Sequence, residues 1–241
     1  MLKVVLTIDC ERFTCFKQTN PRWNWFEKIK GKINNLLKNF RYNKNGFELI
    51  YNTITKEKFP ATFMLVGNQF KKINPPQFIE IGYHTQNHLP LTLINDEQLK
   101  KEIQNKYQTK SFTAPMWMIE DKNNPTRIFK LLKKNNYTHC VYRGQNNKTK
   151  HFHYNAIKKP FKKYGIICVH VSNFLEGNYN KNKIESIKKD ILENLNKEGI
   201  YLLTTHDFTY KNNKNLLEII YFLKKLEKQN KIKIMRLKDI K

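Results

Sequence analysis

Two histidines separated by three residues, His84 and His88, are the side chains of this sequence best placed to bind a metal ion. They follow a short apolar run, residues 78–81. Neutral imidazole is a common ligand of divalent metals, zinc in particular. The spacing alone is a weak signal, because an isolated histidine pair more often has a structural role. The pair becomes more informative because other apolar runs of the chain also end in residues that can bind a metal or transfer a proton.

Two of those runs also end in groups that can bind a metal or transfer a proton. Residues 3–8 are followed by Asp9 and Glu11, and residues 201–205 are followed by His206. Carboxylates and imidazoles therefore occur at the C-terminal ends of three separate runs. In α/β proteins with parallel strands, ligands bind at that edge of the sheet. We expect these side chains to converge on one site.

Short apolar runs alternate with amphipathic helical patterns along the chain, which favours a parallel sheet. About seven such units in 241 residues favour a barrel over an open sheet. Without an internal repeat or a low-complexity linker, we predict a single domain over residues 1–241, with a basic and aromatic insertion at about 12–45. Strands are predicted at residues 3–8, 61–66, 78–81, 110–114, 137–142, 165–171, 201–205 and 232–235. Helices are predicted at residues 46–58, 96–107, 125–135, 184–197 and 213–229.

The composition is strongly basic, with 45 lysines and arginines against 20 acidic residues and a formal net charge of +25. Such a charge attracts polyanions, including nucleic acid, anionic glycans and membrane surfaces. The lysines are spread from Lys3 to Lys241 without a long uninterrupted block. This distribution favours a general compositional bias over a dedicated binding patch. Nucleic acid is therefore a disfavoured partner, and an anionic or lipid-linked substrate is compatible with the charge.

The four cysteines, Cys10, Cys15, Cys140 and Cys168, contain no Cys-x-x-Cys pair. Cys140 and Cys168 fall within apolar runs, which predicts buried free thiols and a reducing compartment. No apolar stretch approaches the roughly twenty residues that span a bilayer. The chain reaches Asp9 without the apolar core of a signal peptide. These features predict a cytoplasmic protein with no transmembrane segment.

Taken together, the motifs resemble those of the NodB-like polysaccharide deacetylases, carbohydrate esterase family 4. The family's acidic motif, usually Thr-Phe-Asp-Asp, is similar to residues 7–11, and its His-Ser/Thr-x-x-His motif matches residues 84–88. Its Ala-Thr-Phe-Phe strand resembles residues 61–64. Its Arg-x-Pro motif corresponds to residues 113–115, and its motif of leucine followed by histidine resembles residues 202–206. The order and spacing of these motifs cover nearly the whole chain.

The resemblance implies a deformed (β/α)7 barrel of the NodB type. It also implies a bound divalent metal, usually Zn²⁺, and hydrolysis of N-acetyl groups on sugars. By their positions in the motifs, Asp9 matches the general base and His206 the general acid. His84 and His88 match two of the metal ligands.

The third metal ligand has two candidates, Cys10 and Glu11. In the plain family pattern the ligand falls at Cys10, whereas some members use an acid one residue later, which is Glu11 here. Side chains two residues apart on a strand point to the same side. Asp9 and Glu11 can therefore both face the site while Cys10 turns away. We favour Glu11 on this ground.

The stretch that follows the fourth predicted strand carries the remaining motif residues. The backbone N–H of Met116, just after Pro115, resembles the family's oxyanion donor. Pro115 and Trp117 are candidate substrate-binding residues, although Trp117 can equally belong to the core or the rim. The main departure from the family is Thr113, where members usually carry an arginine held against the catalytic acid. Arg143, after the fifth predicted strand, is our hypothesis for its replacement.

The sequence thus predicts a metal-dependent hydrolase that removes N-acetyl groups from an amino-sugar-containing glycan or glycoconjugate. Two alternatives stand beside this prediction. One is a metal-free amide or cyclic-amide hydrolase of the same fold, which the two metal-type histidines disfavour. The other is a basic binding protein that keeps the fold with weak or no catalysis, which the missing arginine and the charge of +25 allow.

Overall fold

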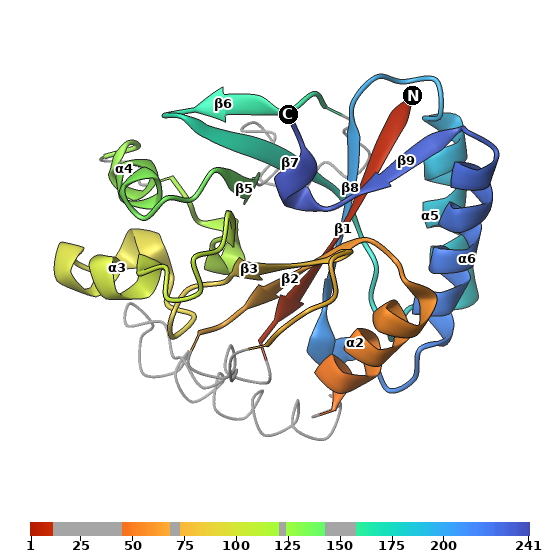
Figure 1. Ribbon diagram of the computed structural model, residues 1–241, viewed down its shortest axis with the longest axis horizontal. Helices are drawn as coiled ribbons and strands as arrows, with labels where there is room; N and C mark the ends of the chain where they lie inside the picture. Colours follow the sequence, from red (N-terminus) through yellow and green to blue (C-terminus); the bar gives the residue numbers. More distant parts are fainter. Residues whose placement is uncertain (12–44, 68–72, 121–123, 143–157) are drawn as a thin grey trace, which may run out of the picture.

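Seven parallel strands close into a barrel in the computed structural model, which describes residues 1–11, 45–67, 73–120, 124–142 and 158–241 (Figure 1). The strands of the ring are β1 (Leu2–Cys10), β2 (Ala61–Leu65), β3 (Ile79–Tyr83), β4 (Ser111–Thr113), β5 (His139–Tyr142), β7 (Ile166–Phe174) and β8 (Ile200–His206). The deformed (β/α)7 barrel expected from the sequence is confirmed.

Closure of the barrel depends on β1, which has different neighbours along its length. One edge of β1 pairs with β8 over residues 3–9. The other edge pairs first with β9 (Ile232–Met235), over residues 2–5, and then with β2, over residues 7–10. The extra strand β9 therefore separates the first half of β1 from β2, and this insertion deforms the barrel. A short strand that was not predicted, β6 (Phe161–Lys163), pairs antiparallel with β7.

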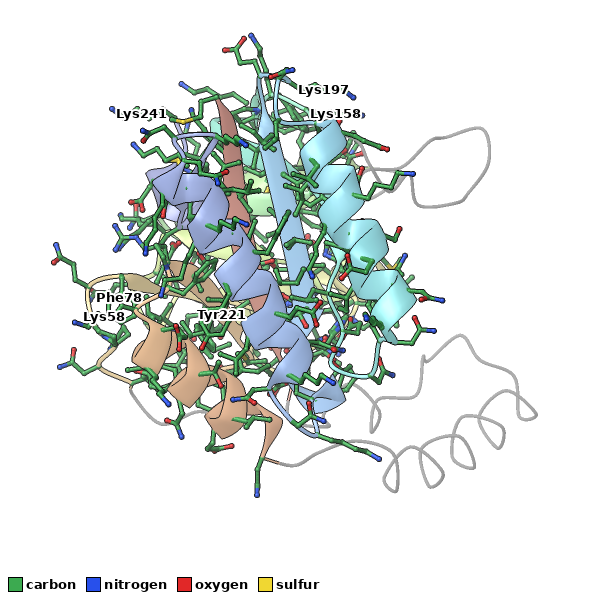
Figure 2. The ribbon with its side chains drawn as sticks, turned by 90° about the vertical axis from the view of Figure 1, so that its right-hand side faces the viewer. Lys58, Phe78, Lys158, Lys197, Tyr221 and Lys241 are labelled. Atoms are coloured by element: carbon green, nitrogen blue, oxygen red, sulfur yellow. The ribbon has the colours of Figure 1, made fainter. Side chains whose placement is uncertain are left out.

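Helices cover the outside of the barrel in two groups. They are α2 (Gly46–Glu57), α3 (Asp96–Ile103), α4 (Arg127–Lys134), α5 (Lys181–Glu193) and α6 (Lys214–Lys228). Figure 1 shows α2, α5 and α6 on one side and α3 and α4 on the other, and Figure 2 shows α5 and α6 side by side in front of the strands. None of the helices in the described ranges has the length and apolar character needed to cross a membrane.

The side chains of β1 show how the core is divided. Val4, Leu6 and Ile8 face outward into the apolar cluster formed with α2, α5 and α6. Val5 faces inward, in a second cluster that fills the barrel, and the alternation along a strand directs Asp9 to the same side. Asp9 therefore faces the inside of the barrel at the C-terminal end of β1.

The opposite end of the barrel is closed by a 3-10 turn, η5 (Leu237–Asp239). Leu237 packs into the inner apolar cluster, and its N–H donates to the Thr62 hydroxyl at 2.9 Å. The N–H of Lys238 donates to the inward-facing carboxylate of Glu80 at 3.0 Å. Lys158, Lys197 and Lys241 lie at this same end of the molecule (Figure 2). The C-terminal segment of the chain therefore covers the N-terminal ends of β2 and β3, at the end of the barrel opposite to Asp9.

Helices α3 and α5 differ most from their predicted boundaries, and α5 also ends at Glu193, four residues earlier than predicted. Helix α3 ends at Ile103 rather than at residue 107, because the Asn105 side chain instead closes a turn, accepting the N–H of Thr109 at 2.9 Å and donating to its carbonyl at 2.8 Å. Helix α5 begins at Lys181, three residues earlier than predicted, because the Asn180 side chain caps it by accepting the N–H of Lys183 at 3.0 Å.

Gly46, the first residue of α2, lies against the backbone that follows β8. A Cβ at position 46 would stand 1.8 Å from the carbonyl oxygen of Asp207, so no side chain fits there. Glycine is required by this close approach and not by an unusual backbone angle. Since Asp207 directly follows His206, the contact ties the start of α2 to the site-bearing end of the barrel.

We expect Gly46→Ala to lower the free energy of unfolding by about 1–3 kcal/mol, because the added methyl group must displace the Asp207 backbone or the helix. Urea-induced unfolding measures the change. Asn52→Ala, at an exposed position of the same helix, is the matched control and should change the free energy of unfolding by less than about 0.5 kcal/mol. Equal effects of the two substitutions would show that the close contact imposes no constraint.

Candidate active site

Three buried groups that can bind a metal meet at the C-terminal ends of β1 and β3. They are Glu11, which follows β1, His84, which follows β3, and His88 in the next loop. Glu11 Oε1 lies 3.4 Å from His84 Nε2 and 3.2 Å from His88 Nε2, and the two Nε2 atoms are 3.0 Å apart. A tetrahedral zinc ion with bonds of about 2.0–2.1 Å separates its ligand atoms by roughly 3.3 Å. The three atoms therefore have the spacing of one face of a tetrahedral metal site.

The orientation of His84 also suits a metal ligand. Its Nδ1–H donates to the backbone carbonyl of Thr113 at 2.9 Å, which leaves the lone pair of Nε2 directed at Glu11. Metal-binding histidines commonly donate their other ring N–H in this way. The carbonyl of the residue that replaces the family's arginine thus orients one of the candidate ligands.

Glu11 and Cys10, the two candidates for the third ligand, point in opposite directions. The Glu11 side chain lies with the two imidazoles, whereas Cys10 faces outward into the apolar cluster beneath the helices, with Sγ 3.3 Å from the carbonyl oxygen of Ile8. The Glu11 N–H donates to Asp207 Oδ1 at 3.0 Å, which joins the end of β1 to the end of β8. This geometry favours Glu11 as the ligand.

Charge within the cluster is balanced between the carboxylate and the imidazoles. Burial opposes ionisation of Glu11, but His88 and His84 outweigh it and hold the pKa of Glu11 well below its ordinary value. Burial also opposes protonation of His84, yet the carboxylates of Asp9 and Glu11 raise the pKa of His84. A buried carboxylate this close to imidazole nitrogens is an arrangement that a bound cation stabilises.

Asp9 lies beside the cluster on the inward face of β1 and is 2% exposed. Burial raises the pKa of Asp9 against the opposing influence of His84 and His206. Within the described residues, Asp9 Oδ1 is buried and has no hydrogen-bond partner, and the same holds for the hydroxyl of Thr113. Asp9 therefore carries an acceptor that is available for a proton.

His206, the last residue of β8, is oriented by Glu176. Its Nδ1–H donates to Glu176 Oε1 at 2.7 Å, and the other Glu176 oxygen accepts the Thr209 hydroxyl at 2.7 Å. His206 Nε2 then faces the cluster, 3.8 Å from Glu11 Oε1. Burial opposes protonation, but Glu176, assisted by Glu11 and Asp9, raises the pKa of His206 to about 10. The imidazole is therefore protonated at neutral pH and can donate a proton from Nε2.

Glu176 is the functional candidate that the sequence analysis missed. It follows β7 at the same end of the barrel as the other charged groups, so the rule that found Asp9 and His206 applied to it as well. The predicted strand stopped at residue 171, whereas β7 continues to Phe174 through a β-bulge between Val171 and Asn173. The bulge interrupts the alternation by which a strand is followed in sequence.

Pro115, Met116 and Trp117 form a tight turn, η3 (Pro115–Trp117), at the end of β4. Met116 and Trp117 both have positive φ, 53° and 51°, and the Trp117 N–H closes the turn on the Ala114 carbonyl at 2.9 Å. The Trp117 ring lies 5.2 Å from the ring of Phe174 and 6.5 Å from that of His206, so it forms part of the wall beside the candidate acid. Oxyanion binding by the Met116 N–H and substrate contacts of Pro115 and Trp117 stay predictions.

Arg143 and nearly all of the insertion predicted at residues 12–45 lie outside the described residues. Replacement of the missing arginine by Arg143 therefore stays a prediction.

We expect Glu176→Gln to lower the pKa of His206 in the metal-free protein, because the carboxylate that favours the imidazolium is replaced by a neutral amide. NMR titration of the imidazole resonances measures the pKa. In the wild type the imidazolium should persist until the pH approaches about 10, and in the variant it should be lost at lower pH. Glu185→Gln, which removes an exposed carboxylate on α5, is the control and should leave the His206 titration unchanged. An unchanged titration in Glu176→Gln as well would contradict the assignment.

No protein-family model and no curated protein sequence matches this chain. Solved structures do match it over almost its whole length. A candidate polysaccharide deacetylase from Mycobacterium smegmatis superimposes with a TM-score of 0.64 at 13% identity, over 99% of this chain and 88% of that one. PuuE allantoinase gives 0.57 at 10% identity, over 99% and 88%. The Xyl-CE4 domain of a multidomain xylanase from the hindgut metagenome of Trinervitermes trinervoides gives 0.51 at 9%, over 98% and 88%.

These likenesses confirm that the chain has the barrel of the polysaccharide deacetylase type, which its motifs predicted. At such low identities the likeness is one of fold. A barrel shared with both deacetylases and an allantoinase does not select the reaction. The chemistry has to be argued from the side chains of the site.

Proposed function

We propose that this protein is a metal-dependent hydrolase that removes N-acetyl groups from an amino-sugar-containing glycan or glycoconjugate. The observation that carries the proposal is the convergence of Glu11, His84 and His88 next to Asp9 and His206. Amide hydrolysis requires an activated water, a proton acceptor and a proton donor for the leaving amine. The motif resemblance to polysaccharide deacetylases supports an N-acetylated sugar as the amide. The net charge of +25 is compatible with an anionic or lipid-linked substrate.

Zn²⁺ is the divalent ion that we propose for Glu11, His84 and His88. Two imidazole nitrogens and one carboxylate oxygen are a donor set of catalytic zinc sites, which keep a further position open. When bound, zinc would lower the pKa of a coordinated water toward roughly 7 and polarise the acetyl carbonyl. Two observations support Zn²⁺ at this site. They are the chemistry of the three donor groups and the distances of 3.0–3.4 Å between the two Nε2 atoms and Glu11 Oε1.

Asp9 is the proposed general base. Its side chain is buried beside His84 with one oxygen that has no donor within the described ranges, so the carboxylate can accept the proton of the attacking water.

His206 is the proposed general acid, which protonates the leaving amine from Nε2. The ring contacts of its imidazole are aromatic: Phe208 at 5.1 Å, Phe174 at 6.4 Å and Trp117 at 6.5 Å between ring centroids. These rings form an apolar wall beside the proton that His206 would transfer. The backbone N–H of Met116 is the proposed oxyanion donor, and one such donor is typically worth about 3 kcal/mol.

Purified wild-type protein should contain about one transition metal ion per chain, and His84→Ala should lose it, because the substitution removes one of the three donors. Elemental analysis before and after reconstitution with Zn²⁺ measures the metal content. Wild-type protein with metal should then release acetate from N-acetylated amino sugars. Absence of metal from the reconstituted wild type would contradict the proposal and leave the metal-free hydrolase and the inactive binding protein as the functions to pursue.

Asp9→Asn should lower the rate of acetate release by about 10²–10⁴-fold, the usual contribution of a general base. Its metal content should match the wild type, because Asp9 is not one of the three proposed ligands. Turnover and elemental analysis on the same preparation separate the two effects. Unchanged turnover would show that another group accepts the proton.

A further inference from the structure

The loop that carries His88 has an unfavourable backbone conformation. Thr85 and His88 both have positive φ, 63° and 60°, in a region that non-glycine residues rarely occupy and that is least suited to a β-branched residue such as threonine. Residues held this way persist only where the surrounding structure over-determines them. The contacts that hold residues 84–89 therefore decide whether both imidazoles can reach Glu11.

Those contacts converge on one residue of α3, Glu102, which is 1% exposed. Its Oε2 accepts the N–H of Asn87 at 2.9 Å and that of Leu89 at 3.4 Å, and its Oε1 accepts the side-chain amide of Asn87 at 2.7 Å. Its backbone carbonyl accepts the N–H of Gln86 at 3.1 Å. One buried residue thus binds the backbone on both sides of His88.

The N–H of His88 itself donates to the Thr85 hydroxyl at 3.0 Å. Three consecutive N–H groups, at residues 87–89, therefore have defined acceptors, two of them on Glu102. Within the described residues, the Glu102 carboxylate has no ion-pair partner, so these N–H donors are what compensates its buried charge. The conformation of the loop and the burial of the Glu102 carboxylate therefore stabilise each other.

Helix α3 gives Glu102 a fixed position. Asn95 and Gln98 form a capping box at its first turn, with bonds of 2.9 and 3.3 Å. At the other end, Leu99 and Ile103 are buried in the apolar cluster shared with α4, and the Tyr137 hydroxyl donates to the Ile103 carbonyl at 3.2 Å. Contacts with helix α3 therefore fix the position of the loop, in addition to its covalent connection to strand β3.

We propose that Glu102 is a positioning residue for the metal site, which holds the backbone around His88 so that both imidazoles face Glu11 before a metal ion binds. The inference rests on the metal site proposed above. Glu102 does not contact the metal or the substrate in this role. It acts through His88, and its effect should therefore appear in metal affinity and coordination geometry.

The test compares Co²⁺ binding to wild-type protein, Glu102→Gln and a control, Glu97→Gln. Glutamine keeps the size of Glu102 but removes its charge and one of its two acceptor oxygens, so the three hydrogen bonds from the loop to this side chain cannot all be kept as they stand. Glu97 lies on the same helix with a side chain that is 78% exposed. The dissociation constant of Co²⁺ is measured by chelator competition, and its visible absorption spectrum reports the coordination geometry.

We expect Glu102→Gln to raise the dissociation constant by about 10–100-fold, the usual effect of losing an outer-shell partner, and to change the Co²⁺ spectrum. Glu97→Gln should match the wild type in both measurements. Asn87→Ala, which removes the side-chain donor to Glu102 Oε1, should raise the dissociation constant by a smaller factor, and it tests the proposal if Glu102→Gln does not fold. A purely structural role would lower thermal stability and leave the affinity unchanged.

Two results would overturn the proposal, and they are distinguishable. Wild-type protein that binds no Co²⁺ would remove the metal site of the proposed function and the positioning role with it. Wild-type protein that binds Co²⁺, together with a folded Glu102→Gln or Asn87→Ala of unchanged affinity and spectrum, would overturn the positioning role alone.

Discussion

The buried contact between the Glu11 carboxylate and the imidazoles of His84 and His88 is the interaction on which this site depends. Removing a carboxylate from water costs several kcal/mol unless other groups compensate its charge. Glu11 is only 5% exposed, yet His84 and His88 hold its pKa well below the ordinary value. A sequence selected for stability alone would fill this space with apolar side chains. This concentration of charge supports the divalent cation proposed for the site.

The barrel explains why these groups meet although they are far apart in sequence. In the pairing of β1 with β8, Asp9 lies opposite His206 in register, so the proposed base and acid are neighbours on adjacent parallel strands. The Glu11 N–H reaches Asp207 one step further along, which keeps the two strand ends together. His84 enters from β3 on the other side of β2. Since β9 separates β1 from β2 only near their start, the deformation of the barrel leaves the site-bearing ends in contact.

Features that depend on local pattern could be predicted from the sequence, and those made by distant backbone groups could not. The strand at residues 232–235 has the predicted bounds, and Asp9, Glu11 and His206 follow from the ends of apolar runs. Strand β6 was missed because three residues, Phe-Lys-Lys, contain no alternation to detect. Glu176 was hidden by a β-bulge. Glu102 carries no sequence signal at all, since its partners are N–H groups of another segment.

Thr113 is the main departure from the deacetylase motifs. Its presence in place of arginine is consistent with a general base, Asp9, whose ionisation depends on a bound metal ion. An arginine beside a catalytic aspartate keeps the carboxylate ionised by lowering its pKa. Among the described residues, His84 and His206 favour the ionised form of Asp9, but burial outweighs them and raises the pKa of Asp9. A divalent cation held by Glu11, His84 and His88 would lower that pKa again, because a bound ion is often the largest charge in its site. Ionisation of Asp9 would then be coupled to metal binding, whereas in a metal-free hydrolase of this sequence only the described imidazoles would oppose the effect of burial on Asp9.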